Sequence, residues 1–451
     1  MCGPDGRVGG VEPAHLLSPP VVLAHGIGGR SDLPVPIELV LVGAGCALLV
    51  SFLALAALWK TPRLQGRPDY GRELTGVTPR PVLRVLGLIS LLLVIGQLFV
   101  PLLGLQLVTG RPTIAPVMVW VVVWLLVPFA SAVIGNWYAD LNPWRTTASL
   151  FRLGRFERVH LIGSLGLWPA SLMFLVFIWL ELVHPTSGAP LTLARAALLV
   201  TLTVLVGISV VGRETGLQLL DPFTTYNRLI SAISPLGRSS TGRIVWRGWL
   251  RSLTVIPEWK GLWFFLVVMI GTVTYDGASD SDWFVSATAW MGGGRLAQTL
   301  SLLLTVGVVG LGYLGASWAA ARLGGGTWST VRVAQRFAHS LVPIALAYAF
   351  AHYFTLVIFE GQQLFAAVSD PFGIGWDLFG TADRRIDFWV RSTDPIWYIQ
   401  VATIVGGHVL AVILAHDRAL ADFGRGALRS QYAMLVLMIS LTSLGLMVQT
   451  G

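Results

Sequence analysis

Residues His339–Glu360 read HSLVPIALAYAFAHYFTLVIFE, and residues Ile396–Asp417 read IWYIQVATIVGGHVLAVILAHD. Each stretch is apolar over about 20 residues, the length that a helix needs to cross the hydrocarbon core of a membrane. Each also holds one histidine in its interior, His352 in the first and His408 in the second. Ionisable side chains inside a membrane are costly and usually functional, so these two histidines are the first candidates for a site.

Similar apolar stretches recur along the whole chain of 451 residues, of which 54% are hydrophobic and only 12% charged. This composition excludes a soluble domain. A single chain segment that crosses the lipid, unless it belongs to a closed β-barrel, can satisfy its backbone hydrogen bonds only as a helix. The sequence therefore predicts an all-α, polytopic transmembrane helix bundle, with residues 34–451 as a single transmembrane domain. About ten spans are expected, at 34–59, 82–107, 113–139, 161–183, 191–211, 260–275, 296–320, 338–360, 395–416 and 430–449.

Arginine and lysine are concentrated in alternate loops between these spans. The loops 60–84, 141–158, 213–260, 322–336 and 417–430 hold 23 of the 31 basic residues. Basic loops stay in the cytoplasm, so both termini are predicted to be extracytoplasmic, in a bacterial plasma (inner) membrane. The net charge of +8 thus comes from basic loops that orient the chain in the membrane, and not from a nucleic-acid-binding patch. No nucleic-acid partner is therefore expected, and the lipid bilayer is the main partner.

Residues 1–33 are predicted to form an extracytoplasmic tail. Val22-Leu23-Ala24 before His25 fits a signal-peptidase site, although the preceding residues lack a basic region and a long apolar run. Two interpretations stay open, an uncleaved tail or cleavage before His25 in the remnant of a signal peptide. Cleavage would make His25 the N-terminal residue, whose imidazole and free amine could bind copper together.

A short motif occurs twice, as Asn142-Pro143-Trp144-Arg145-Thr146 and as Asp221-Pro222-Phe223-Thr224-Thr225. Asn or Asp before Pro favours the start of a helix, with the polar side chain as its N-cap. Each motif opens an amphipathic, arginine-bearing stretch. Two short cytoplasmic amphipathic helices are therefore predicted on the membrane surface, with their basic sides toward lipid headgroups. The alternative is a substrate gate, because parallel repeats also occur in transporters.

Helical spacing groups polar and small residues around both interior histidines. One stripe consists of Tyr348, His352 and Thr355, and the other of Gln400, Thr403, Gly407 and His408. Such stripes face protein or a cavity rather than lipid. Two interpretations are open, a catalytic or ligand-binding site and a set of hydrogen bonds between helices. Under the first, the predicted catalytic residues are His352, His408, Tyr348 and Gln400.

Further ionisable residues gather near the predicted outer ends of the spans. Glu181 and His184 have the i, i+3 spacing of carboxylate–histidine metal sites on helices, and Glu360 closes the eighth span. One E-x-x-H copy also fits a purely structural role. If a divalent metal (Zn, Cu or Mn) binds here, the candidate ligands are His25, Glu181, His184, His352 and Glu360.

Two loops on the same side are polar. Asp276, Asp280 and Asp282 lack the spacing of a calcium loop and are predicted to lie in a solvated turn. The loop 361–394 is long for a connection between helices, and long loops are usually functional lids or disorder. Its aromatic and charged residues favour a folded extracytoplasmic cap.

Several motifs together resemble one family. They are AHGIGGRSDLP at 24–34, GNW at 135–137 with NPW at 142–144, TYDG at 274–277, HSLVP at 339–343 with HY at 352–353, WDLFGT at 376–381 and AHDR at 415–418. In this combination the chain resembles, over nearly its whole length, the polytopic bacterial membrane proteins called fenitrothion hydrolase. The resemblance implies an enzyme that hydrolyses lipophilic esters of the organophosphate type.

A neutral phosphotriester would be a small lipophilic substrate that enters from the bilayer, into a cavity between the eighth and ninth spans. There we expect His352 to act as general base or metal ligand and His408 to orient the site. Tyr348 or Gln400 would polarise the phosphoryl oxygen, and the loop 361–394 would exclude bulk water. The alternative function is a metal-binding membrane component or transporter without hydrolase activity, which a membrane partner subunit could join.

Overall fold

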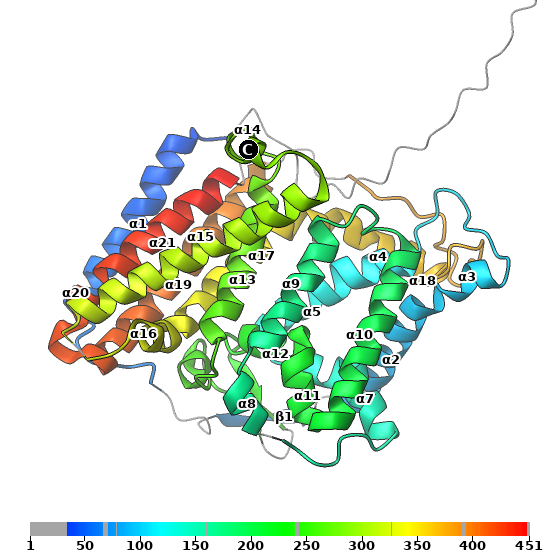
Figure 1. The fold of residues 1–451 in the computed structure, drawn as a ribbon, viewed down its shortest axis with the longest axis horizontal. Helices are drawn as coiled ribbons and strands as arrows, with labels where there is room; N and C mark the ends of the chain where they lie inside the picture. The colour runs from blue at the N-terminus through cyan, green and yellow to red at the C-terminus, as the bar shows by residue number, and fades with distance from the viewer. Residues whose placement is uncertain are drawn as a thin grey trace, which may run out of the picture.

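A computed structural model describes residues 34–65, 71–77, 79–158, 160–239, 243–325, 327–388 and 394–448. The described chain is a helix bundle with one small sheet (Figure 1), which confirms the all-α fold class. A long helix, or a row of consecutive helices, occupies each of the ten predicted stretches. They are α1 (Ile37–Leu58), α2 (Arg80–Gly96), the row α4 (Ile114–Pro116), η1 (Val117–Leu126) and α5 (Val127–Ile134), α9 (Trp168–Leu182), α10 (Pro190–Val211), α13 (Leu262–Ala278), α15 (Gly294–Leu323), α17 (Leu341–Phe359), α19 (Asp394–Phe423) and α21 (Tyr432–Val448).

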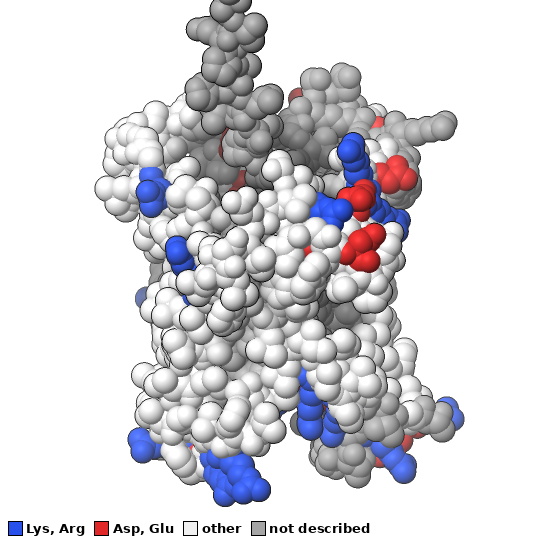
Figure 2. Space-filling view, turned by 90° about the vertical axis from the view of Figure 1, so that its right-hand side faces the viewer, with Lys and Arg blue, Asp and Glu red and all other residues white. Residues whose placement is uncertain are grey.

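Six helical segments among the described residues are long and apolar enough to cross a membrane. They are α1, the row α4–η1–α5, α10, α15, and the runs Thr330–Ser369 and Asp394–Ser430, which contain α17 and α19. Helices α13 and α14 (Asp282–Thr288) meet the same criterion only as a pair bent by 105°, and α9 and α21 are apolar but shorter. Large apolar side chains such as Leu39, Leu92 and Val206 are exposed, and Figure 2 shows a broad band almost free of charge between the two charged ends. These features are typical of a multi-pass membrane protein.

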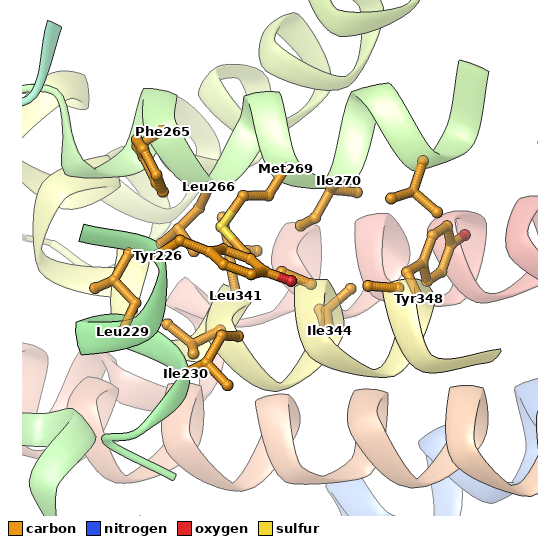
Figure 3. Close-up of a cluster of buried hydrophobic side chains, with 14 of the residues drawn as sticks. Tyr226, Leu229, Ile230, Phe265, Leu266, Met269, Ile270, Leu341, Ile344 and Tyr348 are labelled. Atoms are coloured by element: carbon orange, nitrogen blue, oxygen red, sulfur yellow. The ribbon is translucent and has the colours of Figure 1, made fainter. Parts of the chain in front are cut away.

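Helix α17 lies at the centre of the bundle, packed against α13, α19, η1 and α12 (Pro222–Ile230). Figure 3 shows the apolar core where α12, α13 and α17 meet, with Leu341 and Ile344 on α17. The crossing of α17 with α19 is close because Gly407 has no side chain. A Cβ atom at this position would lie 2.4 Å from the Ala347 Cβ and 2.9 Å from the Pro343 carbonyl oxygen.

A three-stranded antiparallel sheet joins two predicted cytoplasmic loops that are far apart in the sequence. Its strands are β1 (Arg72–Val77), β2 (Leu236–Arg238) and β3 (Arg243–Trp246), in the order β1-β3-β2. Arg72 lies opposite Trp246 in the register. We call this end of the molecule the sheet end and the opposite end, where α14 lies, the α14 end. Helix α1 begins and α21 ends at the α14 end (Figure 1).

The prediction that the second repeated motif forms a helix on the membrane surface is wrong. Helix α12 is enclosed in the core, where Phe223, Tyr226 and Leu229 are buried. Its polar side also finds partners inside the protein, since Asn227 accepts a hydrogen bond from Ser131 at 3.2 Å. Seven of the nine residues of α12 are buried and its basic residue, Arg228, is exposed, so the sequence pattern does not distinguish a largely buried helix from one on the membrane surface. The first copy, α7 (Pro143–Leu150), does keep an exposed side, where Leu150 is 70% exposed.

The described part of the loop 361–394 is folded and contains the end of η5 (Glu360–Gln362) followed by α18 (Gln363–Ser369). The Asp370 carboxylate accepts hydrogen bonds from the backbone of Ile374 and Gly375, at 3.0 and 2.8 Å, and pairs with Arg111 at 3.3 Å. Helix α18 packs on α4 and η1. The later part of the cap reaches the end of α17, where the Phe388 ring lies 5.1 Å from the Phe359 ring. Residues 389–393 fall outside the described part.

Candidate functional site

Asp276 is the centre of a buried polar cluster near the α14 end. The His352 Nε2 atom lies 2.9 Å from Asp276 Oδ2, and the Tyr353 hydroxyl donates to the same oxygen at 2.7 Å. The side chains of Asp276 and His352 are 6% and 8% exposed. A carboxylate bonded to one ring nitrogen fixes the orientation and tautomer of an imidazole. The pair therefore holds the His352 imidazole in a defined orientation.

A second carboxyl group, Glu181 on α9, adjoins this pair. Glu181 is 4% exposed, and neither of its oxygens makes a hydrogen bond within the described part of the chain. The indole N–H of Trp124 lies close to the Glu181 carboxyl, but the two do not reach hydrogen-bond geometry. Asp276, Tyr226 and Tyr353 are its other titratable neighbours. Buried polar groups nearly always have a hydrogen-bond partner, so an unbonded carboxyl indicates a binding site for a proton, an ion or a ligand. We call Glu181, Asp276, His352 and Tyr353 the carboxyl cluster.

Three helices carry the members of this cluster, and a fourth carries the neighbouring Trp124. Glu181 lies in the last turn of α9 and Asp276 in the last turn of α13, whereas His352 and Tyr353 are consecutive residues of α17. Trp124 comes from η1, a π-helix of ten residues. Short π-helical segments occur often at functional sites, because the wider turn changes the direction of the side chains.

Sequence reasoning found Glu181 and His352 but missed Asp276 and Tyr353. The prediction of a solvated turn at Asp276 is wrong, because α13 continues to Ala278, past the predicted end of the sixth span at 275. This extension keeps Asp276 inside the bundle. The available signal was the TYDG motif at 274–277, which places an acidic residue directly after an apolar helix.

The other three predicted catalytic residues contact different groups. His408 Nδ1 lies 2.9 Å from the Ile404 carbonyl oxygen, and its Nε2 has no hydrogen-bond partner among the described residues. The Tyr348 hydroxyl donates to the carbonyl of Leu441, and its ring lies 6.0 Å from that of His408. Gln400 donates to the Ala351 carbonyl at 2.8 Å. The structure thus gives Tyr348 and Gln400 hydrogen bonds between helices and turns His352 toward α13, away from the partners of His408.

The predicted metal ligands are dispersed. Helix α9 ends at Leu182, so His184 lies in the following turn and its Nδ1 accepts from the Thr186 backbone at 3.3 Å instead of facing Glu181. Glu360 bonds with Gln363, and His25 lies outside the described residues. Within the described ranges, no three His, Cys, Asp or Glu side chains are grouped to hold one metal ion.

A second buried polar cluster lies toward the sheet end and joins the two repeated motifs. The fully buried Asp221 carboxylate accepts hydrogen bonds from Asn142 at 2.7 Å, Thr224 at 2.6 Å, Tyr138 at 3.1 Å and the Phe223 backbone at 3.0 Å. We call this group the Asp221 cluster. Burial raises the pKa of Asp221 to about 6, and the hydrogen bonds from these four donors partly oppose the increase.

The AHDR motif fixes the sheet end. His416 lies 3.0 Å from the Trp59 carbonyl oxygen, and Asp417 accepts hydrogen bonds from four groups of residues 59–65. Arg418 donates to the Thr254 carbonyl at 2.8 Å. The motif therefore holds α19 against two loops, which gives these three residues a structural role.

Comparisons with known proteins do not identify this chain. No family model, curated protein or solved structure matches it.

Proposed function

We propose that this chain is a proton-dependent membrane transporter, with the carboxyl cluster as its proton-binding site. The observation that carries the proposal is the buried, unbonded carboxyl of Glu181 beside the Asp276–His352 pair. Ionisable side chains inside membrane bundles commonly form proton and ion pathways. A carboxyl buried without a hydrogen-bond partner favours binding a proton, because the ionised form is costly to bury.

The cluster couples a proton to the packing of helices because its members come from different helices. When Glu181 releases its proton, a second negative charge appears beside Asp276. Two like charges in a buried site repel each other and lose hydration, which favours separation of α9 from α13. His352 and Tyr353 keep Asp276 hydrogen-bonded through the cycle and hold it against α17.

The finer topology belongs to the same proposal: ten spans in a bacterial plasma membrane, both termini outside and the sheet end in the cytoplasm. The distribution of basic residues supports it. Reporter fusions after Gly154 and Gly237 are expected to score as cytoplasmic, and fusions after Asp280 and Arg384 as extracytoplasmic. The opposite score at any two of these positions would contradict the topology.

The transport function is tested in everted membrane vesicles that respire and report their pH gradient with an acridine dye. With the wild-type chain, addition of Na⁺, K⁺ or a lipophilic amine is expected to dissipate the gradient for at least one of these probes. Glu181→Gln removes the titratable group at nearly constant shape, so this variant is expected to abolish the response.

The matched control is Glu360→Gln, which changes a carboxyl that is bonded to Gln363 and lies outside the cluster. This variant is expected to behave as the wild type. If vesicles with the wild-type chain respond as empty vesicles to all three probes, or if Glu181→Gln keeps the full response, the transporter proposal is wrong.

A second candidate function is the hydrolysis of lipophilic organophosphate-type esters, which the resemblance to fenitrothion hydrolase implies. The bond between Asp276 and His352 favours it, because a histidine oriented by a carboxylate is the usual general base of hydrolases. The test is release of nitrophenol from fenitrothion-type substrates by the purified chain in detergent. Activity that His352→Ala abolishes would support the hydrolase, and activity that this variant retains would remove His352 from the reaction.

A further inference from the structure

A row of aromatic side chains connects the Asp221 cluster with the carboxyl cluster. The Phe223 ring lies with its centroid 6.3 Å from the Tyr138 ring and 6.4 Å from the Trp124 ring. The Tyr138 hydroxyl belongs to the Asp221 cluster, and the Trp124 indole N–H adjoins Glu181. The Phe223 ring thus lies between the Tyr138 ring of the Asp221 cluster and the Trp124 ring beside Glu181, within an aromatic group that also contains Phe174, Phe177 and Tyr226.

Tyr226 lies on α12, as Phe223 does, and places a hydroxyl group nearer to the carboxyl cluster. The side chain is fully buried, and its hydroxyl has no hydrogen-bond partner within the described part of the chain. Figure 3 shows the hydroxyl directed away from Leu229 and Ile230, along α17 toward Ile344. Glu181 is its charged neighbour. Helix α12 therefore has the Asp221 carboxylate at its start and a free hydroxyl near Glu181.

We propose that Asp221 is a second proton-binding site, facing the sheet end, and that Phe223 is the gate between it and Glu181. The inference rests on the proton function proposed above. In the forward direction a hydronium ion at the sheet end gives a proton to the Asp221 carboxylate and becomes water. The proton then passes through water that enters when the Phe223 side chain moves, and ends on the Glu181 carboxylate. No other bond changes, so the charge moved equals the protons moved.

The groups around Asp221 suit this role. Asn142 and Thr224 are neutral donors and Tyr138 is a titratable donor. Among the described residues, Arg145 of α7 is a charged neighbour of Tyr138. Burial brings the pKa of Asp221 to about 6, so the carboxyl can gain and lose a proton near neutral pH. Asp140, the neighbouring buried carboxylate, is instead paired with Arg238 at 2.5 Å.

The experiment opens the gate by mutation. Phe223→Ser removes the ring and adds a hydroxyl beside the Tyr138 hydroxyl and the Tyr226 hydroxyl, and we expect these polar groups to admit water into the space. Purified protein is reconstituted in vesicles that contain a pH-sensitive dye, and a potassium diffusion potential drives protons inward. Phe223→Ser is expected to admit protons several-fold faster than the wild type. Adding Asp221→Asn or Glu181→Gln to Phe223→Ser is expected to return the rate to the wild-type level.

Two controls separate this route from general leakage. Phe337→Ser opens a comparable space at a buried ring outside the two clusters and is expected to cause no proton influx. Adding Asp140→Asn to Phe223→Ser removes a buried carboxylate that lies outside the route, and the influx is expected to persist.

The outcomes distinguish the two proposals. Influx that Glu181→Gln stops but Asp221→Asn leaves unchanged would overturn the role of Asp221 and keep the proton function. Influx unaffected by either variant would overturn both proposals, and a folded Phe223→Ser protein without influx would overturn the gate. If Phe223→Ser does not fold, infrared titration of the wild type decides. A protonated-carboxyl band that titrates near pH 6 and disappears in Asp221→Asn supports the second site, and an unchanged band contradicts it.

Discussion

Asp417→Ala is expected to lower the free energy of unfolding by about 3–5 kcal/mol, as loss of a buried charged partner does elsewhere. The carboxylate is fully buried and accepts four hydrogen bonds, from the Trp59 indole, the Arg63 and Leu64 backbone and the Gln65 side chain, at 2.5 to 3.2 Å. Without it, four donors lose their acceptor in a site that water enters poorly. Unfolding of the protein in mixed micelles with increasing denaturing detergent measures the change.

The control for this prediction is Asp383→Ala. Asp383 accepts a hydrogen bond from the Arg111 guanidinium at 2.9 Å, but the Asp383 side chain is 81% exposed. Exposed ion pairs contribute about 0–1 kcal/mol, so this variant is expected to unfold almost as the wild type does. Equal losses for Asp383→Ala and Asp417→Ala would show that the buried hydrogen bonds do not hold the sheet end.

Gly407→Leu is expected to prevent α17 and α19 from packing. Even the first added atom would come within 2.4 Å of the Ala347 Cβ and 2.9 Å of the Pro343 carbonyl oxygen. Overpacking in a core costs about 1–3 kcal/mol, and more where the backbone has to move, as it must at Pro343. The fraction of purified protein that elutes as a single folded species in size-exclusion chromatography is expected to fall sharply.

The adjacent residue provides a matched control. A Cβ at Gly406 would meet no atom within 4 Å, so Gly406→Leu adds the same side chain one position away without a clash. This variant is expected to give as much folded protein as the wild type. If both variants lose a similar fraction of folded protein, the cause is the added apolar side chain on α19 and not a clash where α19 crosses α17.

The helices could be predicted from the sequence because each long apolar stretch determines its own structure in a membrane. The contacts between them could not. Spacing along one helix shows that Tyr348 and His352 share a side, but it does not show which helix faces them. The structure places Leu441 of α21 against Tyr348 and Asp276 of α13 against His352.

Two further features escaped prediction for similar reasons. The strands β1 and β3 are short and pair across most of the first half of the chain, so neither carries a recognisable pattern alone. Helix α12 has the amphipathic pattern of a surface helix, yet Ser131 and Asn142 satisfy its polar residues inside the protein. Both depend on partners distant in sequence, which only the folded chain brings together.

The contact between Asp417 and the loop after α1 also determines the order in which the protein can be assembled. Trp59 and Asp417 are 358 residues apart, and the main helical neighbours of α1 are α19 and α21. Helix α1 precedes every other described helix, so the ribosome makes it long before these neighbours exist. Until α19 and α21 have been made, α1 lies in the membrane without these neighbours, in contact with lipid or with an insertion factor. Helix α1 is therefore the first described helix to be made and among the last to pack into the bundle.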